Sequence, residues 1–155
     1  GTGISTRKLA KQNPDFCVIG VDQSQQRLMA EPSPELSNCL LVRSDCQALW
    51  QLMAVHKLHT HNHTLFYPNP WPKASQVKRR VHGHASFKAL LDISPRLELR
   101  TTWETYAREF TQALSIAGRN TELMSFQPLE PITRFEAKYA ASQHTLWRVS
   151  STPSS

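Results

Sequence analysis

Residues 64–73 read TLFYPNPWPK, a short apolar run that breaks off in three alternating prolines. The run from Thr64 to Tyr67 predicts a buried strand. Pro68 ends that strand, because proline has no backbone N–H to donate to a neighbouring chain. Asn69 therefore follows directly after a buried strand, where α/β proteins commonly place binding residues, and it becomes the first candidate site residue.

Similar apolar runs lie on both sides and alternate with helical patterns, which is typical of an α/β fold. The other expected strands cover residues 16–21, 39–42 and 97–101, with weaker candidates at 121–126 and 145–149. The expected helices cover residues 5–11, 23–30, 45–58, 87–93 and 103–117. Gly118 is placed to cap the last helix. Residues 150–155 are polar and predict a frayed tail.

Charge and composition favour a protein that binds a polyanion and argue against a membrane-spanning or secreted protein. The net charge of the 155 residues is +6 and the pI about 9.6, which favours a polyanionic partner. No apolar run approaches the ~18 residues of a membrane span, and the opening Gly1-Thr2-Gly3 does not resemble a secretory signal. The three cysteines form no C-x-x-C pair, which indicates free buried thiols in a reducing cytoplasm.

Two polar clusters surround the strand at 64–67. A basic cluster follows it and is the best candidate for phosphate contact, with a solvated loop as the alternative; its members are Lys73, Lys78, Arg79, Arg80, His82 and His84. Histidines precede it at positions 56, 59, 61 and 63. No cysteine or carboxylate close in sequence completes a metal shell, so we expect a polar loop there and no metal site.

Three motifs in order resemble the bacterial tRNA (guanine-N7)-methyltransferases. FYPNPWPK at 66–73, followed by KRR at 78–80, resembles the family's F-P-D-P-W-x-K and K-R-R. TTWETYA at 101–107 resembles T-D-W-x-x-Y-A, and PITRFE at 131–136 resembles P-x-T-[KR]-[FY]-E. Trp147 falls where the family often has an aromatic residue in its closing strand. The resemblance runs from Gly1 to about Val149.

The resemblance implies a Rossmann-like class I methyltransferase domain over residues 1–149, with a seven-stranded, mostly parallel sheet and helices on both faces. Gly1-Thr2-Gly3 precedes a helix without a strand before it, so we expect the sequence to start within the nucleoside-binding motif. The family's first strand, which is central in the sheet, would then be absent here and leave a gap.

The resemblance also implies a binding site for S-adenosyl-L-methionine. Gly1, Thr2 and Gly3 would let the backbone approach this methyl donor, and the helix start at 5–6 would offer N–H groups to its carboxylate. Asp22 would bind the ribose hydroxyls, or cap the next segment. Asp45 would contact the adenine or cap the helix that follows, and the sequence does not decide between them. Asn69 would lie beside the transferred methyl as the catalytic residue.

The implied substrate is tRNA, methylated at N7 of a guanine in the variable loop. The residues expected to bind it are Lys73, Arg79, Arg80, Thr102, Thr133, Arg134 and Glu136. For Thr133 and Glu136 the alternatives are a turn hydroxyl and a surface ion pair. Trp71 would stack on a base or serve as a packing aromatic.

The departures from the motifs keep other functions open. Asn69 and Thr102 stand where the family has aspartates, and Ser75-Gln76 stands where it often has Arg-His. Each lost partner of a buried base edge costs about 1–3 kcal/mol. The alternatives are a divergent paralogue that binds donor or RNA without this activity, and a methyltransferase for another substrate.

Overall fold

The structure is a computed structural model and describes residues 1–29 and 36–155. Helices and strands alternate along the chain, which confirms the α/β prediction. Their bounds, with η for 3-10 helices, are α1 Ile4–Gln12, β1 Val18–Asp22, α2 Gln25–Met29, β2 Cys39–Arg43, α3 Cys46–Val55, β3 His63–Phe66, η1 Ala74–Arg79, η2 Val81–Gly83, α4 Phe87–Ile93, β4 Leu97–Thr101, α5 Glu104–Ile116, β5 Arg119–Phe126, α6 Arg134–Ala141 and β6 Leu146–Pro153.

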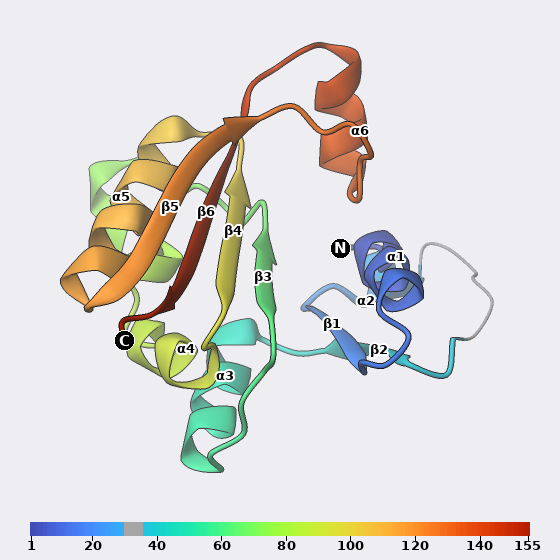
Figure 1. The fold of residues 1–155 in the computed structure, drawn as a ribbon, viewed down its shortest axis with the longest axis horizontal. Helices are drawn as coiled ribbons and strands as arrows, with labels where there is room; N and C mark the ends of the chain where they lie inside the picture. The colour runs from blue at the N-terminus through green and yellow to red at the C-terminus, as the bar shows by residue number, and fades with distance from the viewer. Residues whose placement is uncertain (30–35) are drawn as a thin grey trace.

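The strands form two sheets (Figure 1). β1 and β2 pair in parallel, and a four-stranded sheet has the order β3-β4-β6-β5. In the larger sheet β3, β4 and β5 run in one direction and only β6 runs against its neighbours, so the strands are mostly parallel. Within the described residues no strand joins the two sheets by hydrogen bonds.

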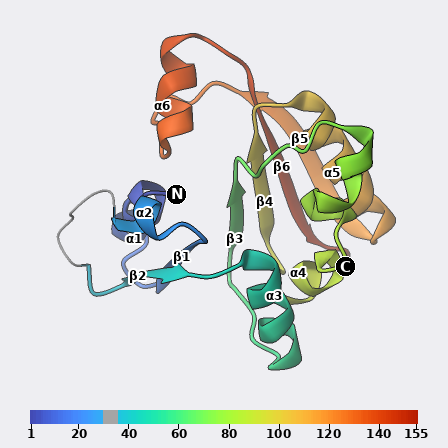
Figure 2. The same cartoon turned by 180° about the vertical axis from the view of Figure 1, so that it is seen from behind.

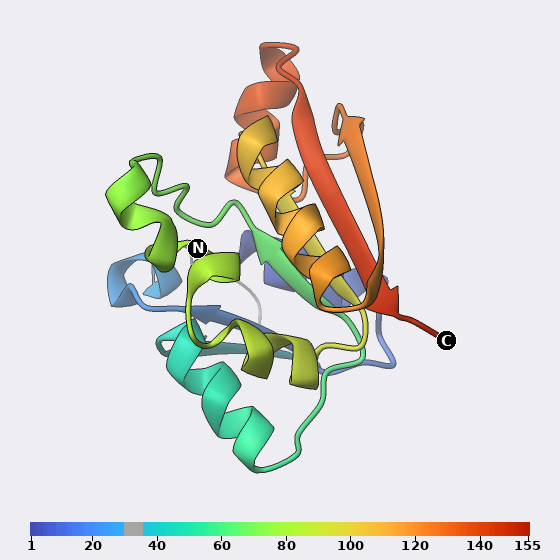
Figure 3. The same cartoon turned by 90° about the vertical axis from the view of Figure 1, so that its left-hand side faces the viewer.

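The main core lies between the four-stranded sheet and helices α3, α4 and α5 (Figure 3). In β4 the alternation of a strand turns Leu97 and Leu99 to this side, and both are at most 2% exposed. From α5, Tyr106, Phe110 and Leu114 meet them at helical spacing, and all three are fully buried. This packing fixes the ends of β3 and β4, where the candidate site lies.

Helix α1 packs on the two-stranded sheet, on the other side of the molecule from α5 (Figure 1). A close approach at Gly20 in β1 makes this possible. A Cβ at this position would lie 2.1 Å from Thr6 Oγ1 of α1, so a larger residue would push the helix off the strand. The position of α1 relative to β1 therefore depends on Gly20.

The structure corrects several boundaries. The frayed tail is wrong for residues 150–153, because β6 continues to Pro153. Ser151 is only 3% exposed there and accepts a 3.0 Å hydrogen bond from Arg119 Nε. The helix expected at 23–30 is shorter, and Ala30 lies outside the described residues. The sequence interpretation missed η1, η2 and α6 entirely.

Two further expectations concern membranes and cysteines. No helix in residues 1–29 and 36–155 is long and apolar enough to cross a bilayer. All three cysteines are free thiols, but the expectation that they are buried is wrong, because Cys17 is exposed and Cys39 and Cys46 are half-buried. Gly118 adopts a left-handed φ of 78° after α5, which confirms its role at the helix end.

Candidate active site

The ends of β3 and β4 bring two sequence-predicted residues to one edge of the sheet. The two strands are parallel, with Phe66 opposite Arg100, so the segments that follow them leave the sheet side by side. Asn69 lies in the segment after β3 and Thr102 in the segment after β4, and both are exposed. Polar side chains at the carboxyl ends of parallel strands are the usual components of a ligand site in this class of fold.

The backbone of the PNPW segment is held in an unusual conformation. Tyr67 and Trp71, on either side of Pro68 to Pro70, have φ of 51° and 45°. Left-handed conformations at non-glycine residues cost on the order of 1–3 kcal/mol each and persist where surrounding contacts impose them. Tyr67 N donates to Arg100 O at 2.8 Å, and Trp71 O accepts from Arg80 Nε at 3.0 Å. The loop that carries Asn69 is thus fixed at both ends.

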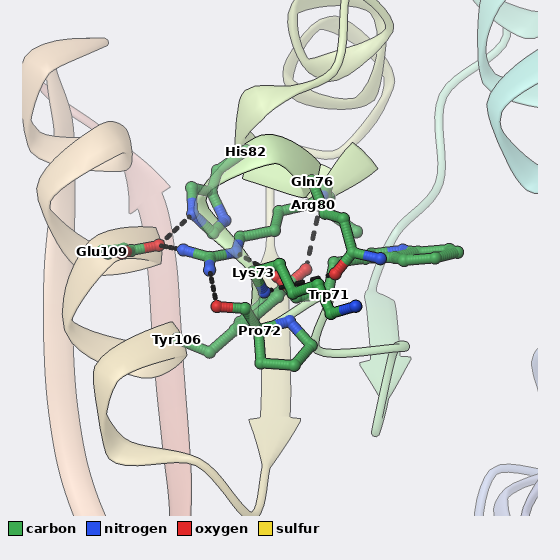
Figure 4. Close-up of polar contacts among 9 residues, drawn as sticks. Trp71, Pro72, Lys73, Gln76, Arg80, His82, Tyr106 and Glu109 are labelled. Atoms are coloured by element: carbon green, nitrogen blue, oxygen red, sulfur yellow. Dashed lines mark hydrogen bonds and ion pairs between the residues drawn. The ribbon is translucent and has the colours of Figure 1, made fainter. Parts of the chain in front are cut away.

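Arg80 supplies most of the support at the second end (Figure 4). Its guanidinium donates to Trp71 O, to Pro72 O at 3.4 Å and to Glu109 Oε2 at 2.6 Å. Arg80 is only 4% exposed. The sequence interpretation placed it among the substrate-binding residues, but an interior guanidinium bonded to its own loop has no free path to phosphate. We therefore assign Arg80 to positioning the loop.

Glu109 joins this support to helix α5. Besides Arg80, its Oε2 contacts His82 Nε2 at 3.0 Å. Burial would raise the pKa of Glu109, but the hydrogen bonds from Arg80 and His82 and the charge of Arg80 outweigh it and hold the pKa below its usual value. Burial lowers the pKa of His82 more than Glu109 raises it, so His82 favours the neutral form. Val81 N donates to Tyr106 OH at 3.0 Å and anchors the same segment in the core.

The other cations of the basic cluster face solvent. Lys73, Lys78 and Arg79 are exposed, and the last two lie in the last turn of η1. The guanidinium of Arg79 lies 4.9 Å from the centre of the Trp71 ring. Trp71 is half-buried and adjoins this cation, so it is not a plain core aromatic. Of the three residues of the KRR motif, Lys78 and Arg79 are thus exposed, whereas Arg80 lies inside the protein.

Glu136 connects α6 to the ends of β3 and β4. It is fully buried, and its Oε1 accepts from Tyr67 OH at 2.8 Å and from Arg100 Nη1 at 2.7 Å. Its Oε2 accepts from Ile132 N at 2.8 Å. The alternative of a surface ion pair is therefore wrong. Burial and the contact with Glu136 raise the pKa of Tyr67, so its hydroxyl stays protonated and donates.

Thr133 caps the same helix. Its hydroxyl accepts from Glu136 N at 3.0 Å, which is the turn role weighed from the sequence. Arg134, the next residue, is exposed on α6. With both carboxylate oxygens of Glu136 engaged, direct contact of Thr133 or Glu136 with a base stays a prediction.

The donor-binding residues gather around the start of α1. Gly3 is the N-cap with φ 83°, and no side chain caps the helix, so its first N–H groups remain available to an anion. Asp22, at the end of β1, accepts from Ser24 N at 2.7 Å and contacts the Gly1 amino group. Burial would raise the pKa of Asp22, but these hydrogen bonds and the charge of Arg27 lower it. Its carboxylate is therefore an ionised acceptor.

Asp45 caps helix α3. Its Oδ1 accepts from Gln47 N at 3.0 Å, so the cap weighed from the sequence is confirmed. A contact between Asp45 and an adenine stays a prediction.

One hydrogen bond connects the donor side of the molecule to the segment before α6. Lys8 Nζ of α1 donates to Pro131 O, just before α6, at 2.8 Å. Figures 1 to 3 place the N-terminus near the end of β3 and near α6. The elements that carry the donor-side residues, the β3 end and α6 are thus neighbours, and a single site formed by Asp22, Asn69 and Thr133 stays a prediction.

The histidines before β3 do not form a metal group. Among the described residues no cluster of three or more His, Cys, Asp or Glu could hold a metal ion. His63 is the first residue of β3 rather than part of a loop, and its Nδ1 lies 2.8 Å from Ser94 Oγ. Burial lowers the pKa of His63 to about 4, which keeps the ring neutral.

Comparison with known proteins identifies the family. Residues 1–149 match Methyltransf_4, a family described as "Putative methyltransferase". The chain belongs to this family.

Methyltransf_4 relatives with curated names are similar along most of the chain. The tRNA (guanine-N(7)-)-methyltransferase of Paraburkholderia xenovorans is 30% identical over 95% of this chain and 60% of its own length. The protein of the same name from Pseudomonas fluorescens is 31% identical over 95% of this chain and 66% of its own length. The chain therefore spans about three fifths to two thirds of these relatives.

Solved structures support the fold. An antibiotic-related methyltransferase has a TM-score of 0.67 at 16% identity, over 97% of this chain and 82% of its own. The antibiotic-resistance methyltransferase Kmr has a TM-score of 0.61 at 20% identity, over 100% and 84%. At this identity they establish a methyltransferase fold for the Methyltransf_4 chain and nothing of its substrate.

Three residues that build the site were not singled out from the sequence: Tyr67, Arg100 and Glu109. Tyr67 carried a signal, because the family motif has phenylalanine where this chain adds a hydroxyl. That hydroxyl now bonds Glu136. Arg100 and Glu109 showed no such signal in the sequence, because the ion-pair partner that gives each its role lies at least 29 residues away.

Proposed function

We propose that this protein transfers a methyl group from S-adenosyl-L-methionine to N7 of a guanine in the variable loop of tRNA, in the cytoplasm. One observation carries the proposal: the loop of Asn69, held by Arg80 and Arg100 at the end of β3, leads directly into the exposed cations of η1. The family match and the names of the relatives agree with this arrangement.

The residues near α1 fit the donor. S-adenosyl-L-methionine supplies a methyl group on a sulfonium, and it carries a carboxylate and a ribose that the protein must hold. The uncapped first turn of α1 offers N–H groups to the carboxylate. Asp22, ionised because its pKa is lowered, accepts from the ribose hydroxyls, and Gly1, Thr2 and Gly3 line the approach.

These residues catalyse the reaction by positioning the guanine and the methyl donor. Guanine N7 has an exposed lone pair, so no side chain needs to remove a proton. The protein contributes by fixing the base and the donor in line, and such orientation is worth up to roughly 7–11 kcal/mol. Asn69 and Thr102 lie at the edge where the base would be oriented, while Lys73, Lys78 and Arg79 hold the RNA backbone.

A labelling assay tests the proposal. The protein is incubated with bulk tRNA and donor carrying a radioactive methyl, and the tRNA is digested to nucleosides. We expect label in 7-methylguanosine. Label in another nucleoside, or donor binding without any transfer, would reject this function and favour one of the alternatives raised by Asn69 and Thr102.

A further inference from the structure

Three aromatic side chains form a continuous series that leads from the candidate site along α6. The rings of Tyr67 and Phe135 have centroids 5.4 Å apart and an interplanar angle of 18°. The rings of Phe135 and Tyr139 are 6.4 Å apart at 14°. We call Tyr67, Phe135 and Tyr139 the aromatic row.

Burial does not explain the aromatic row. Phe135 is 53% exposed, although a phenylalanine on a short helix would normally face the core. In Figures 1 and 2 α6 stands apart from the sheet and from the helices of the main core. The only fully buried residue of α6 is Glu136, and it fixes the helix to Tyr67 and Arg100. Phe135 is therefore anchored through its neighbour Glu136 and still faces solvent, between the half-buried rings of Tyr67 and Tyr139.

Two cations of α6 accompany the outer part of the row. Lys138 Nζ lies 5.8 Å from the centre of the Tyr139 ring, and Arg134 lies one turn earlier at the start of the helix. The one acidic residue of α6 is Glu136, whose two oxygens are engaged inside the protein. An exposed surface of α6 thus combines flat aromatic rings with cations and presents no carboxylate.

We propose that the aromatic row binds unpaired nucleotides of the RNA next to the methylated guanine, by stacking bases on its rings. This rests on the tRNA methylation proposed above. Unpaired bases in RNA loops bind proteins by stacking on aromatic side chains, and cations interleaved with the rings contact the phosphates. Tyr67 lies two residues before Asn69, so the row begins at the candidate site. A base displaced from the variable loop would bring its neighbours onto Phe135.

Binding measurements with Phe135→Leu test the row. Leucine keeps an apolar side chain but removes the ring, so we expect the Kd for tRNA to rise about tenfold or more while donor affinity stays unchanged. Phe135→Trp keeps a stacking face and should bind tRNA nearly as well as the unchanged protein. Ile116→Ala, at a position 80% exposed on α5, is the matched control and should not change the Kd.

The outcomes separate this inference from the proposed function. If the unchanged protein forms 7-methylguanosine and Phe135→Leu binds and methylates tRNA equally well, the row has no RNA role and the function stands. If no methyl is transferred but Phe135→Leu weakens RNA binding, the row is supported and the enzymatic function fails. Photo-crosslinking of 4-thiouridine-containing tRNA to Phe135 or Tyr139 is a second readout, and crosslinks confined to other elements would overturn the row.

Discussion

Asn69 and Thr102 occupy the two positions where the related motifs have aspartates, and both are exposed at adjacent strand ends. A guanine presents N–H donors on its edge, and a carboxylate accepts them better than an amide or a hydroxyl. We predict that Asn69→Asp combined with Thr102→Asp raises kcat/KM for tRNA about tenfold. Thr105→Asp, exposed nearby on α5, adds a similar charge and should give no gain. An unchanged kcat/KM in the double variant would show that these positions do not orient the base.

His63 makes stability depend on pH. Its pKa is about 4 in the folded protein, against an ordinary value near 6.5, because burial disfavours the charged ring. The unfolded chain takes up a proton below about pH 6.5 and the folded protein does not, so stability is complete above that pH and falls toward pH 4. The slope is at most about 1.4 kcal/mol per pH unit.

His63→Asn removes this titration. We predict that Tm falls between pH 7 and pH 5 in the unchanged protein and falls less steeply in the variant, as followed by circular dichroism. His82, whose pKa is also lowered, leaves a residual dependence of the same sign in both. Parallel Tm curves for the two proteins would mean that His63 is protonated equally in the folded and unfolded states.

At the scale of elements, α6 depends on one buried carboxylate. Glu136→Gln keeps the size of the side chain but removes the charge that pairs with Arg100. Breaking a buried pair costs about 3–5 kcal/mol, and Arg100 retains Glu98, so we expect a smaller loss. Hydrogen exchange should accelerate in α6 and at Tyr67 but not in α5. Glu98→Gln, at a half-buried position, is the control, and equal exchange in both variants would contradict the anchoring role.

Helix α6 also shows what the sequence pattern could not predict. The strands and long helices were predictable because their apolar residues recur at strand or helix spacing, as Tyr106, Phe110 and Leu114 do. Helix α6 buries one residue fully, a glutamate, so it has no apolar period to detect. The end of β6 was missed for a similar reason, since Ser150 and Ser151 are polar yet paired with both β4 and β5, and Thr152 pairs with β5. These elements are stabilised by distant partners, which spacing does not reveal.

For the whole molecule, the candidate site joins two sheets. β1 and β2 contribute Asp22 and the donor side, and the four-stranded sheet contributes Asn69 and Thr102. The motif order predicted that Asn69 and Thr102 follow neighbouring strands, because carboxyl ends of parallel strands share an edge, and their gathering with Asp22 stays a prediction. It did not predict which cations face outward. Lys78, Arg79 and Arg80 are consecutive, and the last one lies inside because it bonds Glu109 and the carbonyls of the PNPW loop.

The difference between the exposed lysines and the interior Arg80 can be measured through the salt dependence of tRNA binding. Each lysine that neutralises a phosphate contributes about 0.7–0.9 to the slope of log Kd against log salt concentration. We predict that Lys73→Gln and Lys78→Gln each reduce the slope for tRNA by roughly that amount without changing Tm. Arg80→Lys keeps the charge but loses the bonds to Trp71 and Pro72, so it should lower Tm and leave the slope unchanged. If instead Arg80→Gln reduced the slope as much as Lys78→Gln did, its guanidinium would have to reach the RNA, and the loop would need to open for binding.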